Sequence, residues 1–335
     1  MLKVEPWQGG GEAWDRIVKQ QAGWTPFHLH AWRDIIARCF GHECPYLVAR
    51  DAHGIAGVLP QVLVRSPIFG RFLVSMPYVN YGGPLGSPDA VSALAEEATR
   101  LGRAARVKLT EFRSREELPI LLPASHRKIT VVLDIPPLDA PGLFKRFDSK
   151  LRSQVRRPQK EGIVVRWGHH QLDAFYSVFA EHMRDLGTPV LPRRFFAQVL
   201  RAFGEDAWLG VAWKGDIPIA GGLGFRWDAE FEMTWASALY AYNKLSPNML
   251  LYWAFMERAC AEGLTLFNFG RCSPGAGTHR FKSQWGSRDE QLWWYQDSRA
   301  GVSTPSPDDG AYALGPRVWK KLPLPVANAM GPWIV

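Results

Sequence analysis

One lysine near the end of the chain, Lys282, has neighbours that suit its charge to a role in catalysis. It follows Phe281 and precedes Trp285 in FNFGRCSPGAGTHRFKSQWG, residues 267–286, where a strand-like run stops at Gly270 and a glycine-rich loop follows. A lysine between aromatic side chains loses hydration, so its field is stronger than in water. Such a cation can stabilise the negative charge that builds on a carbonyl oxygen during acyl transfer. A surface lysine beside buried aromatic residues has the same spacing, so both interpretations stay open.

A basic segment in the middle of the chain, LFKRFDSKLRSQVRRPQKEG, predicts an anion-binding helix. Phe147, Leu151 and Val155 recur every four residues and form one apolar stripe. We expect Pro158 to end or kink the helix near Arg157. Guanidinium groups suit phosphate because they donate paired hydrogen bonds, although a solvated linker helix has the same composition. The candidate anion-binding residues are Lys150, Arg152, Arg156, Arg157 and Lys160.

Motifs for other reactions are missing. The sequence has no G-x-S-x-G elbow, no P-loop and no H-E-x-x-H, and His169-His170 lacks a third metal ligand nearby. We therefore expect no metal and no bound cofactor. No spacing selects a general base from Asp34, Glu111 and Asp185. The stretch MPYVNYGGPLG, with Tyr78, Asn80 and Tyr81, suits either a strand end that approaches a ligand or a structural turn.

Composition indicates a two-domain protein that is kept in the cytoplasm. The 335 residues are 47% apolar and 21% charged, and they exceed one usual core of about 150 residues. The formal charge of +8 favours an anionic partner. The four cysteines have neither CxxC spacing nor a disulfide pattern. No basic leader precedes an apolar stretch, and no run of 18 apolar residues occurs, which predicts a cytoplasmic protein.

Two segments of the chain repeat one order of elements. Each predicts a helix, two strands joined by a turn, a third strand, a crossover helix and a last strand. In the first segment the third strand is RFLVSMPYVNYGGPLG, residues 71–86. A crossover helix connects parallel strands, whereas the short turn connects antiparallel ones. We predict an α/β fold (α+β) of tandem acyltransferase-like domains, each a mixed, mostly antiparallel sheet flanked by helices.

This element order resembles the GNAT acyltransferase fold, in which the acyl donor lies where the sheet splays near the crossover helix. In the second segment that helix is SPNMLLYWAFMERAC. Ser246 is expected at its N-cap and Pro247 at its first position, which leaves backbone N–H groups for a phosphate. Ordinary capping gives the same sequence. The glycine-rich pyrophosphate loop of most GNAT proteins that use CoA is not visible in NKLSPNM.

Two stretches resemble the FemABX family of non-ribosomal peptidyl transferases. DSKLRSQVRRPQKEGIVV is similar to the family's SKxRxxIxRxxKxG segment, and LLYWAFMERACAEGLTLFNFGRCSPGAGTHRFKSQWG is similar to its helix, strand, FG and late FK signature. The resemblance extends over about residues 20–295. The ending WKKLPLPVANAMGP resembles the branch associated with PEP-CTERM and exosortase gene clusters.

The resemblance implies tandem GNAT-like domains that transfer an aminoacyl group from aminoacyl-tRNA to an amine of a peptidoglycan precursor. In the exosortase-linked branch, an exopolysaccharide or another anionic, lipid-linked sugar is the corresponding acceptor. Lys282 matches the family's late lysine at the acyl-donor site. The donor-binding candidates are Phe281, Ser246, Asn248, Gly270 and Trp285. The acceptor-binding candidates are Trp32, Arg33, Tyr78, Asn80 and Tyr81.

Three functional hypotheses follow. The first is an acyl or aminoacyl transferase that acts on a cell-envelope precursor. The second is an N- or O-acyltransferase that uses acyl-CoA or an acyl carrier protein as cosubstrate. The third is a basic scaffold that only binds polyanions or membranes, which predicts salt-sensitive binding without a covalent product.

The predicted domains are residues 1–144, residues 145–298 with the basic helix and the FK loop, and a linker with a tail at 299–335. The tail, RVWKKLPLPVANAMGPWIV, is basic and apolar. It either packs back onto a domain or lies peripherally on the inner face of the membrane.

Overall fold

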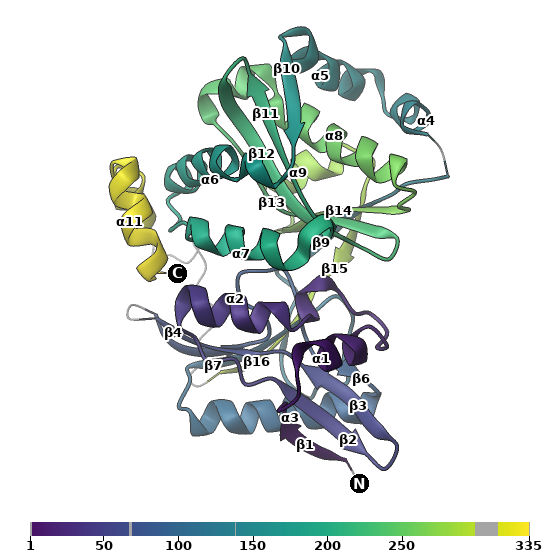
Figure 1. Cartoon of the computed structure of the whole chain (residues 1–335), viewed down its shortest axis with the longest axis vertical. Coiled ribbons are helices and arrows are strands. Elements are labelled where there is room, and N and C mark those ends of the chain that lie inside the picture. The colour runs from purple at the N-terminus through teal and green to yellow at the C-terminus, as the bar shows by residue number, and fades with distance from the viewer. Residues whose placement is uncertain (1, 67–68, 138, 299–313, 335) are drawn as a thin grey trace. The chain divides into compact units, whose positions relative to one another are not determined.

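The computed structural model describes residues 2–66, 69–137, 139–298 and 314–334. These residues form two compact units. Unit 1 contains the described residues up to Ile129 together with 291–298, and unit 2 contains 130–290 together with 314–333. The predicted linker at the start of the tail, residues 299–313, lies outside the described residues. Figure 1 shows the helices and strands of both units.

Unit 1 contains two sheets. Their strand orders are β1-β2-β3-β6 and β4-β5-β7-β16-β8. Its helices are α1 (Gly11–Val18), α2 (Ala31–Phe40) and α3 (Pro88–Ala104). Its strands are β1 (Lys3–Pro6), β2 (Leu47–Asp51), β3 (Gly54–Leu59), β4 (Val62–Ser66), β5 (Gly70–Val74), β6 (Leu85–Gly86), β7 (Leu109–Ser114), β8 (Ala124–Ser125) and β16 (Trp293–Ser298).

Unit 2 is built on one seven-stranded sheet of order β10-β11-β12-β13-β14-β9-β15. Its strands are β9 (Ile129–Asp134), β10 (Ile163–Trp167), β11 (Ala207–Lys214), β12 (Ile217–Trp227), β13 (Glu230–Ala238), β14 (Leu266–Cys272) and β15 (Arg288–Gln291). Its helices are α4 (Ala140–Arg146), α5 (Ser149–Lys160), α6 (Leu172–Leu186), α7 (Arg193–Phe203), α8 (Pro247–Ala261), α9 (Gly277–Ser283), α10 (Leu314–Trp319) and α11 (Leu324–Ile334).

The predicted repeat is confirmed in both units. The hairpins β2–β3 and β11–β12 are antiparallel. The strands on either side of the crossover helix are parallel, β5 with β7 across α3 and β13 with β14 across α8. Unit 2 is therefore a mixed, mostly antiparallel sheet with flanking helices, as the sequence predicts. Unit 1 instead divides its strands between an antiparallel sheet and a mixed, mostly antiparallel one.

Helices cover both faces of the unit 2 sheet. A Cβ atom placed on Gly221 would lie 3.0 Å from the ring of Phe175 in α6, and one on Gly222 would lie 3.2 Å from the ring of Phe255 in α8. Adjacent residues of a strand point to opposite faces. Thus α6 and α8 pack on opposite faces of β12, and these glycines let both helices approach the sheet closely.

The structure corrects one local prediction and one alternative of another. Residues 71–86 do not form one strand, because β5 ends at Val74 and the backbone turns through positive φ at Met76 (55°) and Tyr78 (73°). This left-handed conformation is incompatible with a strand. The basic helix does not end near Arg157 either, since α5 continues through Pro158 to Lys160. Only the last turn follows this proline, so few backbone hydrogen bonds are lost.

Each unit includes a strand from the other half of the chain. Strand β9 follows the elements of unit 1 in sequence but lies between β14 and β15 in the unit 2 sheet. Conversely, β16 follows the elements of unit 2 but pairs with β7 and β8 in unit 1. The observed units therefore differ from the predicted ranges 1–144 and 145–298, because the described residues of 130–144 belong to unit 2 and residues 291–298 belong to unit 1.

The described part of the tail packs onto unit 2. A Cβ atom on Gly187, just after α6, would lie 2.7 Å from Pro316 of α10. Trp319 and Ala327 are buried. No helix in the described ranges is long and apolar enough to cross a membrane.

Candidate functional site

The unit 2 sheet opens between β13 and β14. The two strands pair over three residue pairs, the last of which joins Glu232 to Asn268. Beyond this point β13 continues to Ala238 and remains paired with β12, while β14 continues to Cys272. Beyond Asn268, side chains hold the backbone of β14: the Gly270 N–H donates to Asn268, and the carbonyl oxygens of Gly270 and Arg271 accept from Lys282.

Lys282 is anchored to the far end of β14. Its Nζ atom donates hydrogen bonds to the carbonyl oxygens of Gly270 at 2.6 Å and Arg271 at 3.0 Å. The side chain is only 6% exposed, which confirms the predicted desolvation. Gly270 has φ of 75°, a conformation that favours glycine. A protonated lysine has three donors, so the bonds seen among the described residues leave one N–H for a bound group.

Burial lowers the pKa of Lys282. Loss of hydration, with a smaller contribution from the positive charge of Arg271, lowers the pKa of Lys282 from 10.5 to about 8. Cys272 and Glu232 act in the opposite direction and raise this pKa. The side chain therefore changes charge close to neutral pH, which is a property of groups that take part in catalysis.

A buried network of polar side chains lies where the pairing of β13 with β14 ends. The side chain of Asn268 donates to Glu230 at 2.8 Å and to Glu232 at 3.3 Å. Its oxygen accepts hydrogen bonds from the hydroxyl of Thr130 at 2.6 Å and from the backbone N–H of Gly270 at 2.8 Å. Asn268 thus holds the backbone of Gly270, the residue whose carbonyl accepts from Lys282. Glu232 and Asn268 are fully buried.

Aromatic side chains connect the basic helix to the lysine loop. Phe147, which precedes α5, packs against Trp285 with ring centroids 5.4 Å apart and against Trp253 of α8 at 6.0 Å. On the other side of the loop, Phe281 packs against Tyr252 at 5.0 Å. The structure therefore brings together, within unit 2, the two stretches that carry the family resemblance.

The exposed face of α5 is basic and lines a groove of about 390 Å³. The predicted apolar stripe, Phe147, Leu151 and Val155, is buried on the opposite side. Lys150 is exposed but does not line the groove. Among the described residues, no carboxylate forms an ion pair with the basic side chains of the groove. The groove is lined by Ser149, Arg152, Ser153, Arg156, Arg157, Lys160 and Glu161.

The start of α8 matches the predicted position but not the predicted cap. Ser246 occupies the N-cap with φ of 55°, and its side chain makes no capping hydrogen bond within the described chain. Pro247 occupies the first helical position, as predicted. Asn248 is half-buried one residue further along. Uncapped N–H groups at a helix start suit an anionic ligand.

The acceptor candidates all belong to unit 1. Trp32 and Tyr81 are fully buried, and the Trp32 indole donates to the Pro26 carbonyl at 2.8 Å. Arg33 lies over the Tyr46 ring. The Tyr78 hydroxyl and His42 are 2.9 Å apart. Asn80 is also buried. Their proposed acceptor role stays a prediction.

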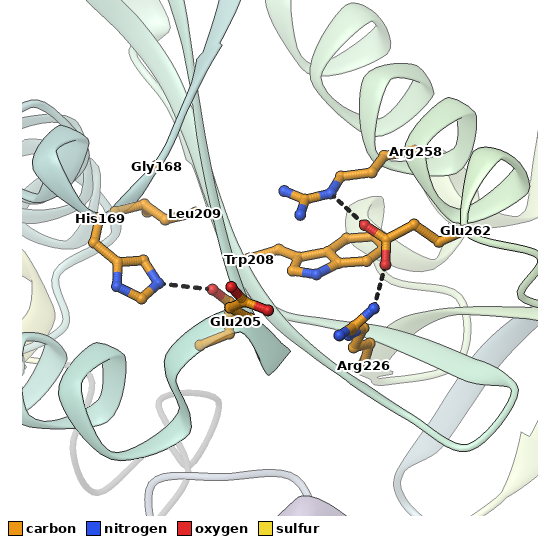
Figure 2. Close-up of a pocket in the computed structure, with 9 residues that line it drawn as sticks. Gly168, His169, Glu205, Trp208, Leu209, Arg226, Arg258 and Glu262 are labelled. Carbon is orange, nitrogen blue, oxygen red and sulfur yellow. Dashed lines mark hydrogen bonds and ion pairs between the residues drawn. The ribbon is translucent and has the colours of Figure 1, made fainter.

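A second pocket of about 390 Å³ lies at the other end of α8 (Figure 2). Arg258 stacks over Trp208 at 4.2 Å and donates to Glu262 at 3.1 Å. Arg226 also pairs with Glu262, and it donates to Asp206 at 2.9 Å. These carboxylates neutralise both arginines, so the pocket holds less free positive charge than the α5 groove.

Sequence reasoning missed the Asn268 network and the pocket of Figure 2. The network had a signal, because Glu232 and Asn268 each stand between two apolar residues of a strand. Arg258 and Glu262 had the i,i+4 spacing of a helical ion pair. No group of three metal-ligating side chains occurs in the described part of the chain.

The two units have the fold of tandem GNAT-type domains. Residues 145–283 match the family described as acetyltransferase (GNAT) domain. No curated protein matches the chain. The fold is similar to the crystal structure of FemX, with a TM-score of 0.63 and 15% identity over 87% of this chain and 97% of FemX. The predicted FemAB-like GNAT fold is thereby confirmed.

Two further solved structures share this fold. One is the C-terminal domain of a protein assigned as a lysylphosphatidylglycerol synthetase from Agrobacterium fabrum, with a TM-score of 0.56, 13% identity, and coverage of 85% of this chain and 90% of that one. The other is a tandem GNAT protein from the clavulanic acid biosynthesis pathway, with a TM-score of 0.55, 13% identity, and coverage of 91% and 100%.

Proposed function

We propose that the protein transfers an activated aminoacyl group to an amine of a cell-envelope precursor, at the opening between β13 and β14. The observation that carries this proposal is the buried Lys282, which is fixed on the β14 carbonyls at the edge of that opening. The GNAT match of residues 145–283 supports acyl transfer. The FemABX resemblance and the lysylphosphatidylglycerol synthetase fold support an aminoacyl ester such as aminoacyl-tRNA as donor.

In the proposed reaction, the acceptor nitrogen attacks the ester carbonyl carbon. A C–N bond forms and the C–O bond to the ribose breaks, and the proton lost by the attacking nitrogen passes to the ribose oxygen, which leaves as a hydroxyl group. Negative charge builds on the carbonyl oxygen before the leaving group departs. The remaining N–H of protonated Lys282 stabilises this charge, and the low dielectric of a buried site strengthens the interaction. The arginines of the α5 groove bind the phosphates of the donor or of the acceptor.

The proposed acceptor is an anionic or lipid-linked precursor of peptidoglycan or exopolysaccharide, reached from the cytoplasmic side of the membrane. The synthetase relative, which is named for an aminoacylated phospholipid, supports a lipid-linked acceptor. We propose no metal and no bound cofactor, since an activated ester needs only positioning and charge stabilisation.

An alternative donor is acyl-CoA or an acyl carrier protein, which the uncapped start of α8 favours because it offers backbone N–H groups to a pyrophosphate. Incubation of the protein with cell-envelope extract and either labelled aminoacyl-tRNA or acyl-CoA, followed by mass spectrometry, identifies the donor and product. Only the true donor should protect Lys282 from chemical modification. If neither donor gives a covalent product, both transferase hypotheses are rejected and the hypothesis of a binding scaffold is favoured.

The variant Lys282→Met tests the lysine. We expect kcat to fall about 100- to 1000-fold, as for removal of one oxyanion donor. Lys108 is a matched control, because its Nζ also donates to a backbone carbonyl, that of Phe69, at a distance of 2.9 Å. Unlike Lys282, Lys108 is exposed. Lys108→Met should keep full activity. Thermal unfolding checks that both variants fold, and unchanged turnover in folded Lys282→Met would reject the catalytic role.

A further inference from the structure

The tail helix α11, yellow in Figure 1, has one face fixed against unit 2. Ala327 is 1% exposed, and Gly331 follows it by one helical turn. A Cβ atom on Gly331 would lie 2.8 Å from the backbone nitrogen of Val190, so only glycine fits this contact. This close approach sets the rotation of α11 about its axis. The opposite face must therefore point away from unit 2.

The outward face of α11 is apolar. Val326, Met330 and Trp333 are 40%, 45% and 81% exposed. Their spacing of four and three residues places them on one side of the helix. The helix contains no charged residue. An exposed apolar stripe of this kind loses free energy in water and gains it when it enters an apolar environment.

Positive charge precedes this stripe in the chain. Arg317, Lys320 and Lys321 are exposed, and residues 314–334 contain no aspartate or glutamate. The basic segment and the exposed apolar face with its tryptophan together offer the two attractions, electrostatic and hydrophobic, that hold a helix at a bilayer interface. Anionic headgroups attract the basic side chains, while the apolar face enters the acyl region.

We infer that the outer face of α11 binds the surface of an anionic lipid bilayer. A second copy of the chain fits less well, because its tail carries the same positive charge and no acidic residue to oppose it. The inference goes beyond the proposed transfer reaction and does not depend on it. It supplies a physical means of holding the protein next to lipid-linked molecules.

Sedimentation of the full chain with vesicles tests the inference. Vesicles of phosphatidylcholine with phosphatidylglycerol should retain the protein, and vesicles of phosphatidylcholine alone should retain far less. The triple variant Val326→Ser, Met330→Ser, Trp333→Ser should bind anionic vesicles at least roughly tenfold more weakly. The matched control replaces Val164 and Ile217 with serine, since both are 50% exposed on unit 2. This control should bind like the parent.

The charged residues have a separate test. Replacing Arg317, Lys320 and Lys321 with glutamine should remove the preference for anionic vesicles, with a loss of roughly fivefold per residue at low salt. Turnover of a soluble amine acceptor should be the same in all tail variants, so a failed transfer reaction is distinguished from a failed membrane contact. Equal vesicle binding by the parent and the serine variant would overturn the inference. The inference would also be overturned if light scattering showed that the parent is a dimer and that only the triple serine variant of α11 is a monomer.

Discussion

Lys282 is buried and donates two hydrogen bonds to carbonyl oxygens. This environment determines the pH at which its ammonium group loses a proton. The folded chain lowers its pKa from 10.5 to about 8 because burial removes hydration. Since the folded pKa is below the unfolded one, this group contributes stability above about pH 10.5, and the contribution is lost as pH falls towards 8. The fold therefore tolerates the charged lysine at a cost, which is expected of a residue kept for function.

The pH dependence of turnover reports which form of Lys282 acts. If the ammonium stabilises the oxyanion, kcat should be high below about pH 8 and should fall as pH rises through that value. Lys282→Arg should shift this falling limb upward, because guanidinium stays charged. The measurement is kcat from pH 6 to 10 with a soluble acceptor. A limb that rises near pH 8 would instead assign neutral Lys282 as a base.

Asn268 is predicted to be the most sensitive polar residue of the unit 2 interior. Its replacement by alanine removes one hydrogen-bond donor to each of two buried carboxylates and the acceptor of the Gly270 N–H. We expect Asn268→Ala to lower the free energy of unfolding by about 2–4 kcal/mol, measured by urea denaturation. Asn243 is exposed and serves as the control, with a change near zero. A similar small change in both variants would contradict the structural role of the network.

The sequence predicts only part of this site. Burial of Lys282 follows from its aromatic neighbours, which are close in sequence. The contact between Asn268 and Thr130 is not predictable in this way, because the two residues lie on strands that meet only when β9 pairs into the unit 2 sheet. Interactions of this range depend on the topology and not on local spacing.

At the scale of elements, the basic face of α5 differs from an ordinary surface because its arginines lack ion-pair partners among the described residues. We expect Arg152→Gln and Arg156→Gln each to weaken donor binding and to reduce the slope of log affinity against log salt by about 1. Titrations at several salt concentrations measure both effects. Arg201, exposed on α7 of the same unit, is the matched control. Equal slopes for all variants would exclude α5 from anion binding.

The order of helices and strands is readable from the sequence, because apolar periodicity and turn residues are local signals. The two local differences from the prediction, the turn after β5 and the continuation of α5 past Arg157, have other causes. Met76 and Tyr78 adopt left-handed backbone conformations that neither residue type favours, so no propensity reveals them. Pro158 stays inside α5 because that helix has only its last turn to complete, and Val155 and Pro158 are held by burial. Tertiary packing overrides propensity at these positions.

At the scale of the whole molecule, the exchanged strands β9 and β16 determine which fragments fold. Residues 145–298 lack β9, which lies between β14 and β15 and supplies Thr130 to the polar network. We expect this fragment to be unfolded or aggregated, since an open strand edge would replace a paired one. Residues 130–290 should give a cooperative thermal transition by circular dichroism. Two equally cooperative fragments would show that β9 is dispensable.

The exchange of strands also affects folding of the chain during translation. Unit 1 reaches its last sheet partner only when β16 emerges, after all the strands of unit 2. The nascent chain therefore carries an incomplete β7 edge during translation of residues 130–290. Sheet pairing across so long a loop is slow, and unpaired edges attract other chains. Chaperone binding during synthesis is thus an expected requirement of this topology.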